Sequence, residues 1–465
     1  MDTEQTKKSA LVIATLNSFI TPFMGSSINV ALPVIGKELQ MDAVMLTWVA
    51  TAYLLAVAVF LVPSGKLGDI YGRKKIFTVG IIVFTISSVF CAASFSTSML
   101  VVFRVIQGVG NAMVFATGMA ILVSVYPPDE RGKVLGINVA AVYIGLSAGP
   151  FLGGFLTQHL SWRSIFLFTI PFCLLILFLI FWRLEGEWAD ASGEKFDFLG
   201  SVIYGVAITG IIIGISLLPA LKSIGIILGA TIALGVFIKW ELTAPYPVFE
   251  IRLFSTNRLF AFSSLAALIN YAATFALTFL LSVYLQHIKA LSPQATGLVL
   301  VAQPLVMAIL SPWAGRLSDR IEPRIVATSG MAITAFGLAL LSPLKPTTSL
   351  AYIVGCNVVL GLGFALFSSP NTNAIMGSVE KRFLGIASGA VATMRSLGMM
   401  LSMGISTVIF SIVMGRVKIT QQQYPLLMKS IVAALVVFII LSIGGVWASI
   451  ARGTSPKEFH EGFEL

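Results

Sequence analysis

The stretch GKLGDIYGRKK, residues 65–75, concentrates five charged side chains in a chain in which only 11% of residues are charged. A similar stretch, GRLSDRIEPR, begins 250 residues later. Its Gly315 and Asp319 repeat Gly65 and Asp69 of the first stretch at that same separation. A charged motif that recurs at a fixed separation indicates an internal duplication of the chain.

The composition predicts that the duplicated units lie in a membrane. Hydrophobic residues make up 57% of the chain, above the ~45–50% typical of soluble domains. Fourteen apolar runs of roughly 20 residues follow one another along the sequence, and each is long enough to cross a ~30 Å hydrocarbon core as a helix. The runs are continuous rather than alternating, which favours helices over a barrel. We therefore expect an all-α polytopic membrane protein with fourteen transmembrane helices.

A second matched pair of motifs divides the chain into halves. The stretches PPDERGKVLG (127–136) and GSVEKRFLG (377–385) carry an acid–base pair, again 250 residues apart. Two six-helix repeats related by an axis along the membrane normal are the plan of one large transporter class. We expect two six-helix bundles with two helices inserted between them. The predicted units are residues 1–184 (N-terminal bundle), 185–257 (linker and two inserted helices), 258–450 (C-terminal bundle) and 451–465 (cytoplasmic tail).

The net charge of +10 reflects membrane topology rather than nucleic-acid binding. With the N-terminus inside, twenty of the thirty Lys and Arg residues fall on the cytoplasmic side, eight fall outside and two lie within helices. This bias follows the positive-inside rule, and an even number of helices places both termini in the cytoplasm. We expect a multi-pass protein of the cell (inner) membrane, in contact with the lipid bilayer and monomeric.

Patterns typical of enzymes are missing from the sequence. The three cysteines lie far apart within apolar runs, and the three histidines lie near helix ends or in the tail. No metal-ligand spacing, nucleotide-binding phosphate loop or hydrolase triad is recognisable. We therefore expect neither enzymatic activity nor a metal or other cofactor.

Several motifs resemble those of one family. GKLGDIYGRKK looks like the loop signature between the second and third helices of the major facilitator superfamily. RVIQGVGNA (104–112) resembles its fourth-helix motif, and GLSAGPFLGG (145–154) resembles the fifth-helix motif common among exporters. INVALP (28–33) and GIASGAVATMRSLG (385–398) resemble the fourteen-helix drug/proton antiporter branch. The resemblance implies export of a small molecule by alternating access, in which two bundles rock about a central site.

The charged loops suit a latch that closes the cytoplasmic side. A carboxylate at Asp69 or Asp319 can meet the positive N-terminal end of a helix from the opposite half. Gly65 and Gly72 permit a close backbone approach, and Arg73 adds charge to the first loop. The alternative is that these charges only fix the topology and solvate the loop.

The fifth apolar run carries a stripe of small residues. Gly145, Gly149 and Gly153 recur every four residues, and Pro150 lies between them. Small residues at this spacing let membrane helices pack closely, and an internal proline bends a helix. Plain packing explains the stripe, and in the resembling family the motif marks export. We add the hypothesis that this surface seals the outer side when the cytoplasmic side is open.

Polar and aromatic residues within the apolar runs are candidates for a substrate cavity. Arginine inside a membrane helix costs ~2.5–3.5 kcal/mol on insertion scales, so it should face the protein interior or water. Arg104 and Arg395 either bind substrate or tie neighbouring helices together. In the plan of the resembling family, the first, fourth, ninth and twelfth helices line the cavity. The candidates are Met24, Arg104, Gln107, Asn111, Asn270, Tyr271, Asn357, Phe364 and Arg395.

One departure from the resembling branch concerns the coupling ion. That branch has an aspartate where this chain has Met24, and all twenty acidic residues map to loops, tails or helix ends. Cation/proton exchange normally needs a carboxylate within the membrane, so we expect a neutral to positive cavity and leave proton coupling open. The leading hypothesis is an exporter of amphipathic, multidrug-like molecules. The alternatives are an organic-anion exporter or facilitator without proton antiport, and a non-transporting membrane sensor or lipid scramblase.

Overall fold

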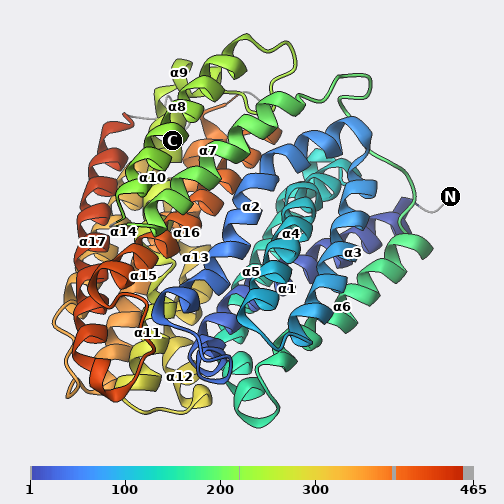
Figure 1. The fold of residues 1–465 in the computed structure, drawn as a ribbon. Helices are drawn as coiled ribbons and strands as arrows, with labels where there is room; N and C mark the ends of the chain where they lie inside the picture. Colours follow the sequence, from blue (N-terminus) through green and yellow to red (C-terminus); the bar gives the residue numbers. More distant parts are fainter. Residues whose placement is uncertain (1–2, 219, 380–383, 454–465) are drawn as a thin grey trace, which may run out of the picture.

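The computed structural model describes residues 3–218, 220–379 and 384–453. Over these residues the chain is a bundle of long helices (Figure 1). Fourteen helical segments are long and apolar enough to cross a membrane. The predicted all-α fold with fourteen transmembrane helices is therefore confirmed.

The first half of the chain forms six spans, each a single continuous helix. They are α1 (Thr3–Glu38), α2 (Ala43–Tyr71), α3 (Arg73–Ala92), α4 (Thr97–Val125), α5 (Pro128–His159) and α6 (Arg163–Trp182). Two further spans follow the linker, α7 (Phe198–Ser216) and α8 (Leu221–Thr243), and then the short α9 (Arg252–Thr256). Side chains cap the starts of several of these helices, as where Asp42 accepts the Met45 backbone N–H of α2.

The second half also forms six spans, two of which are interrupted. One consists of α10 (Arg258–Thr274), α11 (Leu277–Val283) and the π-helical turn η1 (Tyr284–Ile288), and another of α12 (Pro293–Leu300) and α13 (Ala302–Arg320). Sequence analysis predicted continuous helices here. Pro304 has no N–H to donate to the Leu300 carbonyl, and the Ala276 N–H is bound by Ser402 Oγ at 2.9 Å. The remaining elements are α14 (Pro323–Leu341), α15 (Leu350–Gly377), α16 (Leu384–Val413), the 3₁₀ turn η3 (Gln421–Gln423) and α17 (Tyr424–Ala451).

Helix packing repeats between the two halves, as the duplication predicts. On α4, a Cβ at Gly110 would lie 2.8 Å from the backbone oxygen of Gly80 on α3. On α15, a Cβ at Gly363 would lie 2.9 Å from the backbone oxygen of Gly330 on α14. In each bundle two glycines therefore let the same pair of helices touch at the backbone.

Of the two inserted helices, α7 lies along the seam between the two bundles, and α8 packs on α7 (Figure 1). Tyr204 of α7 donates to the Ala58 backbone oxygen of α2 at 3.0 Å. Near the other end of α7, Ser411 of α16 donates to the Leu218 backbone oxygen at 2.9 Å. The insert thus contacts both bundles rather than forming a separate unit.

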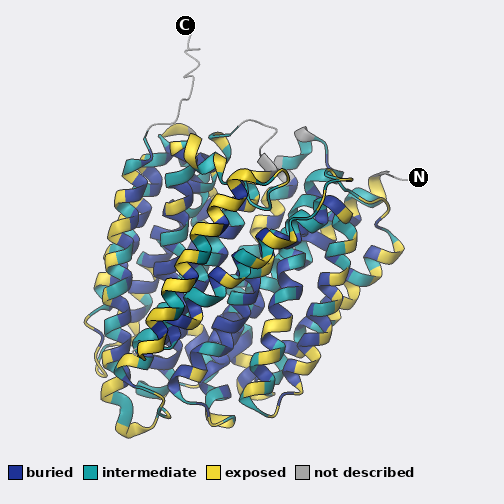
Figure 2. Cartoon of the chain, turned by 45° about the horizontal axis from the view of Figure 1, so that its top comes forward, coloured by how far each residue is buried: buried dark blue, intermediate teal, exposed yellow. Residues whose placement is uncertain are grey.

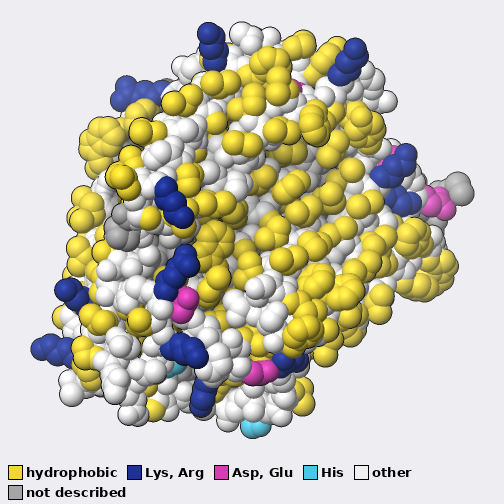
Figure 3. Space-filling view, viewed as in Figure 1, with side chains coloured by type: hydrophobic (Ala, Val, Ile, Leu, Met, Phe, Trp, Pro, Cys, Tyr) yellow, Lys and Arg dark blue, Asp and Glu magenta, His cyan; other side chains and the backbone are white. Residues whose placement is uncertain are grey.

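The molecule has two polar ends, which we call the terminal face and the opposite face. The terminal face carries the start of α1, the end of α17, the turn at Gly72 and the linker at 183–197, and the opposite face carries the loops at 39–42, 160–162 and 414–420 (Figures 1 and 2). Between them the helices bury side chains inward and expose them outward (Figure 2). Hydrophobic side chains cover most of the surface drawn in Figure 3, as a membrane-embedded protein requires.

Candidate functional site

The two bundles are joined near the opposite face. Apart from the contact of Tyr143 with the hydroxyls of Ser311 and Ser368 at mid-depth, the hydrogen bonds that the structure describes between residues 1–184 and residues 258–450 lie in the half of the molecule nearest that face. A typical one is the 2.7 Å bond from Gln286 Nε2 to the Val30 backbone oxygen. The other pairs are Ser282–Val30, Thr407–Thr47, Lys418–Gln40, Ala43–Val417, and Gln294 with both Gln158 and His159.

Glycines of α5 and α12 form a backbone contact between the bundles. A Cβ at Gly297 would overlap the Pro150 carbonyl oxygen and lie 2.8 Å from its carbonyl carbon. In the reverse direction, a Cβ at Gly154 would overlap the Pro293 oxygen and lie 3.0 Å from that carbonyl carbon. We call this contact of residues 150–154 with residues 293–297 the glycine seal. Backbone meets backbone there, which leaves no room for a solute.

The predicted stripe Gly145–Gly149–Gly153 packs within its own bundle. A Cβ at Gly153 would lie 2.6 Å from Ser27 Cβ of α1, and Ser27 donates to the Gly149 oxygen at 3.0 Å. The stripe therefore fixes α5 against α1, and the adjacent face with Pro150 and Gly154 meets α12. One helix carries both the packing that sequence analysis expected and the contact between bundles.

The opening loop, 65–75, is bound by the linker that follows α6. Two ion pairs join them, Arg73 to Asp190 at 2.7 Å and Lys66 to Glu194 at 2.6 Å. Backbone bonds add to these, because the Arg73 N–H donates to the Trp188 oxygen and the Ala191 N–H donates to the Asp69 oxygen, both at 2.9 Å. Sequence analysis missed this contact, although the linker's acidic residues opposite a basic loop were a visible signal.

Gly72 makes the approach of the linker possible. Its φ of 114° lies in a region that favours glycine, and a Cβ there would lie 2.6 Å from Glu187 Oε1. Asp69 accepts two hydrogen bonds from Arg73, at 2.7 and 2.9 Å. Near its end, α13 carries Asp319, whose side chain lies outside the described part of the structure. The latch role of both aspartates remains a prediction.

Three of the predicted cavity residues meet at mid-depth in the C-terminal bundle. The Arg395 guanidinium of α16 lies 5.4 Å from the Tyr271 ring centroid of α10, and that ring contacts Phe364 of α15 edge-on, with centroids 5.4 Å apart. From the N-terminal bundle, Tyr143 of α5 lies beside the hydroxyls of Ser311 and Ser368, in the same part of the interior as Tyr271 and Arg395. We call these six residues the central cluster. Tyr143 was not predicted.

Arg104 and Gln107 instead form a network inside the N-terminal bundle. Arg104 is 1% exposed, and its guanidinium donates to the Val49 backbone oxygen at 3.1 Å and to Gln107 at 2.5 Å. It also stacks over the Tyr53 ring, 4.0 Å from the centroid, while Gln107 donates to Ser88. Of the two roles predicted for Arg104, these contacts correspond to tying α2, α3 and α4 together.

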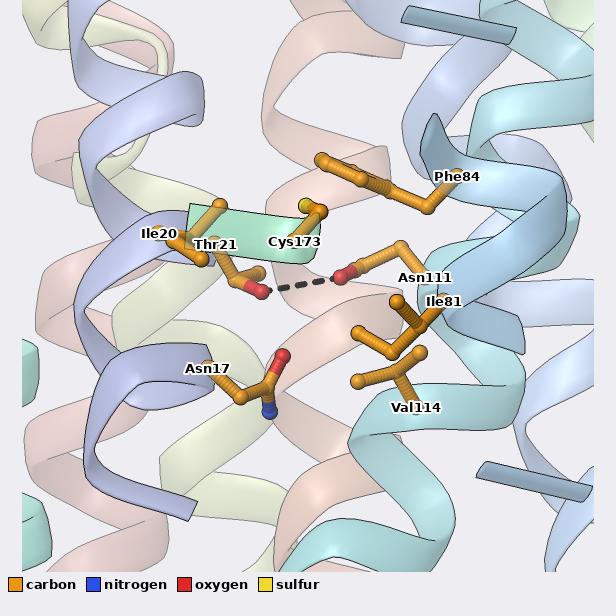
Figure 4. A pocket seen from close by; sticks show the side chains of 8 residues that line it. All are labelled: Asn17, Ile20, Thr21, Ile81, Phe84, Asn111, Val114 and Cys173. Atoms are coloured by element: carbon orange, nitrogen blue, oxygen red, sulfur yellow. Dashed lines mark hydrogen bonds between the residues drawn. The ribbon is translucent and has the colours of Figure 1, made fainter. Parts of the chain in front are cut away.

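A small pocket inside the N-terminal bundle holds Asn111. Residues from α1, α3, α4 and α6 line it, and Thr21 donates to Asn111 Oδ1 at 3.0 Å (Figure 4). Of the other predicted cavity residues, Met24 is fully buried in the core and Asn270 and Asn357 are 1% exposed. Asn357 donates to a carbonyl of its own helix. The structure therefore places Arg104 and Gln107 in one network and Asn111 in a separate pocket instead of gathering all nine residues around one cavity.

Arg452, assigned to the cytoplasmic tail by sequence, is buried just beyond α17. It is 1% exposed and donates to Asn371 Oδ1 at 2.9 Å and to the Pro323 oxygen at 3.0 Å. Burial, together with the charge of Arg324, lowers the pKa of Arg452 to about 10, so it remains charged at pH 7. It joins α14, α15 and α17. Its sequence position carried no signal, because basic residues commonly flank membrane spans.

The fold and this interface define a polytopic helical membrane protein made of two related bundles around a central seam. A sequence model of the Major Facilitator Superfamily matches residues 14–403 and 263–458. The chain belongs to this superfamily, and it is a membrane transporter rather than an enzyme.

Relatives and solved structures agree with this assignment. The chain is 32% identical to the riboflavin transporter RibZ of Clostridioides difficile over 86% of this chain and 87% of the relative. It is 29% identical to a tetracenomycin C resistance and export protein of Streptomyces glaucescens, over 80% of this chain and 70% of the relative. A crystal structure of a POT family transporter in complex with 5-aminolevulinic acid has the same fold, with a TM-score of 0.70, 13% identity and 96% of each chain covered.

Proposed function

We propose that this chain is a secondary active transporter that exports small, amphipathic organic molecules by alternating access. It acts as a monomer in the cell (inner) membrane, because one chain holds both bundles and the seam between them. The terminal face is the cytoplasmic one, as the excess of Lys and Arg on that side predicts. The loop and linker on the terminal face are then cytoplasmic, and the glycine seal is near the outside.

One observation carries this proposal: the described hydrogen bonds between the bundles gather near the opposite face. Alternating access requires a state in which one side is sealed while contacts on the other side are released. In the proposed cycle this structure is the state sealed to the outside. Asp69, paired here with Arg73, exchanges that partner for the start of α16 when the cytoplasmic side closes.

Export rather than import is supported by two kinds of likeness. The glycine motif of α5 resembles the fifth-helix motif of exporters, and its helix contributes to the glycine seal. The tetracenomycin relative is described as a resistance and export protein, whereas RibZ is described as a riboflavin transporter. A planar or amphipathic cargo suits the aromatic side chains of the central cluster.

A reversible lock on the seal tests the proposal. Gln158 accepts the Gln294 N–H across the seam at 3.2 Å, so Gln158→Cys with Gln294→Cys should form a disulfide that holds the outer side shut. In proteoliposomes, oxidation should stop the flux of a fluorescent amphipathic solute and reduction should restore it, while each single variant stays active in both conditions. Flux that survives oxidation contradicts alternating access, and lipid flip-flop without solute flux favours a scramblase. The same vesicles with and without a pH gradient test proton coupling.

A further inference from the structure

Arg104 and Arg395, which lie within membrane spans, and Arg452, which lies just beyond α17, differ in what they contact. Arg104 donates to protein oxygens at 2.5 and 3.1 Å, and Arg452 donates to protein oxygens at 2.9 and 3.0 Å. Arg395 is half-buried, and among the described residues its guanidinium forms no hydrogen bond or ion pair and lies over the Tyr271 ring, 5.4 Å from the centroid. A guanidinium has five N–H donors, so Arg395 retains a full set for a partner that the protein does not provide.

At the position of Arg395, a guanidinium without a hydrogen-bond partner is energetically costly. It lies 11 residues into α16, about 16 Å from the start of that helix. A charge at this depth normally finds a counter-ion or faces water. The acidic side chains that the structure describes all lie at helix ends or in loops, and none pairs with Arg395. The local charge is therefore positive, which favours an anionic ligand.

The surroundings of Arg395 select the shape of that ligand. Tyr271 and Phe364 meet edge-on, and Tyr143 approaches from α5 of the other bundle. Aromatic rings bind planar aromatic groups by stacked or edge-on contacts. The hydroxyls of Ser311 and Ser368 supply neutral polar partners. Because the rings come from both bundles, a ligand held here also bridges the seam.

We propose that Arg395 anchors a substrate site that takes planar aromatic molecules carrying one anionic group, such as a carboxylate. The carboxylate pairs with the Arg395 guanidinium, and the ring system packs between Tyr271, Phe364 and Tyr143. This site adds a substrate class to the proposed transport function. It depends on that function only for the flux measurements, because ligand binding is measured separately. Arg104, which donates to two oxygens of its own bundle and lies over the Tyr53 ring, is not the anchor.

A matched series of ligands tests the charge preference. Binding of 9-anthracenecarboxylate, 9-anthracenecarboxamide and 9-anthracenemethylammonium to the full-length protein in nanodiscs is followed by ligand fluorescence at neutral pH. The carboxylate should bind at least about tenfold more tightly than the amide, because charge-assisted hydrogen bonds are the stronger ones, and the ammonium should bind most weakly. Equal affinities, or a preference for the ammonium, would overturn the proposal.

Variants assign the preference to Arg395. Arg395→Gln should make carboxylate and amide bind equally, and Arg395→Lys should retain part of the preference, because the point charge survives without the fork. The matched control is Arg416→Gln, at an exposed arginine just beyond the same helix, which should keep the full preference. Tyr271→Leu should weaken all three ligands by a similar factor. A preference that survives Arg395→Gln refutes the assignment.

Folding and transport failures are distinguishable from failure of this site. Arg395→Gln breaks no described hydrogen bond, so its thermal unfolding midpoint should equal that of the unmodified protein, and a lowered midpoint contradicts the open guanidinium. Arg395-dependent binding without flux in proteoliposomes would refute the proposed function and leave the site standing. Flux of the ammonium that Arg395→Gln does not change would refute the site and leave transport standing.

Discussion

Adding one methyl group at Gly297 should open the glycine seal without unfolding either bundle. In Gly297→Ala the new Cβ would overlap the Pro150 carbonyl oxygen and lie 2.8 Å from its carbonyl carbon. Carbon atoms pack at about 3.5–4.0 Å, so α5 and α12 must separate by roughly 0.7 Å or more. The obstacle is helix backbone, which cannot swing aside as a side chain can.

This overlap raises the free energy of only one conformation, the one in which the glycine seal is closed. Overpacking typically costs about 1–3 kcal/mol, and a difference of that size shifts a two-state equilibrium by about 5–150-fold. Because α5 and α12 belong to different bundles, separating them relieves the overlap while each bundle keeps its own packing. The population should therefore move from the state sealed at the opposite face toward the state open there.

Spin labels on the opposite face measure this shift. Leu160 is 70% exposed beyond α5, and Thr347 is exposed in the loop before α15, so the pair Leu160→Cys and Thr347→Cys reports the separation of the bundles. The three native cysteines are buried and should label poorly. In Gly297→Ala the fraction of long distances should rise several-fold, with an unchanged thermal midpoint.

Two other glycines serve as matched controls. Gly145→Ala would collide with the Phe19 backbone inside one bundle, so it should lower the thermal midpoint and leave the labelled distance unchanged. Gly355 has nothing within 4 Å of an added Cβ, so Gly355→Ala should change neither, apart from a small gain in helix propensity. An unchanged distance distribution in Gly297→Ala would refute the reasoning that this contact seals the opposite face.

Three further predictions concern the linker and the two arginines that donate to protein oxygens, Arg104 and Arg452. Asp190→Asn combined with Glu194→Gln should speed tryptic cleavage within the linker a few-fold, because partly exposed ion pairs contribute about 0–1 kcal/mol each; equal cleavage rates would mean that backbone bonds alone hold the linker. Arg452→Ala should destabilise the C-terminal bundle by about 1.5–3 kcal/mol, seen as a lower thermal midpoint, and Arg452→Lys should lose less. Arg104→Gln should lower the midpoint and leave the order of anthracene affinities unchanged; a changed order would restore Arg104 as a substrate residue.

The sequence predicted the fold class well because its signal is physical and local. A run of about 20 apolar residues needs a membrane, and a backbone in lipid must satisfy its own hydrogen bonds, so each run becomes a helix. The matched motifs 250 residues apart predicted the duplication, which recurs as Gly80–Gly110 and Gly330–Gly363. Local pattern failed only where Pro304 and the Ala276–Ser402 bond interrupt two spans.

The candidate site was harder to predict, because spacing along one helix does not say what its polar face meets. Arg104 and Arg395 look alike as arginines within apolar runs, yet one is bound by α2 and by its own helix and the other contacts only an aromatic ring. From the sequence, Arg452 was assigned to the cytoplasmic tail as one of the charges that set membrane topology, but in the structure it is buried. Whether a buried charge is satisfied depends on atoms that are distant in sequence.

By itself, therefore, the sequence determined that this protein crosses the membrane fourteen times, is built by duplication and carries a charged loop and a glycine stripe at defined positions. The tertiary structure alone decided that the linker binds that loop, that α5 meets α12 backbone to backbone, and that Arg395 rather than Arg104 remains open. The physical reason is how far apart in the sequence the interacting residues lie. Hydropathy and helix periodicity act between near neighbours in the chain, whereas ion pairs, close contacts and the satisfaction of a buried guanidinium depend on which helices are brought together.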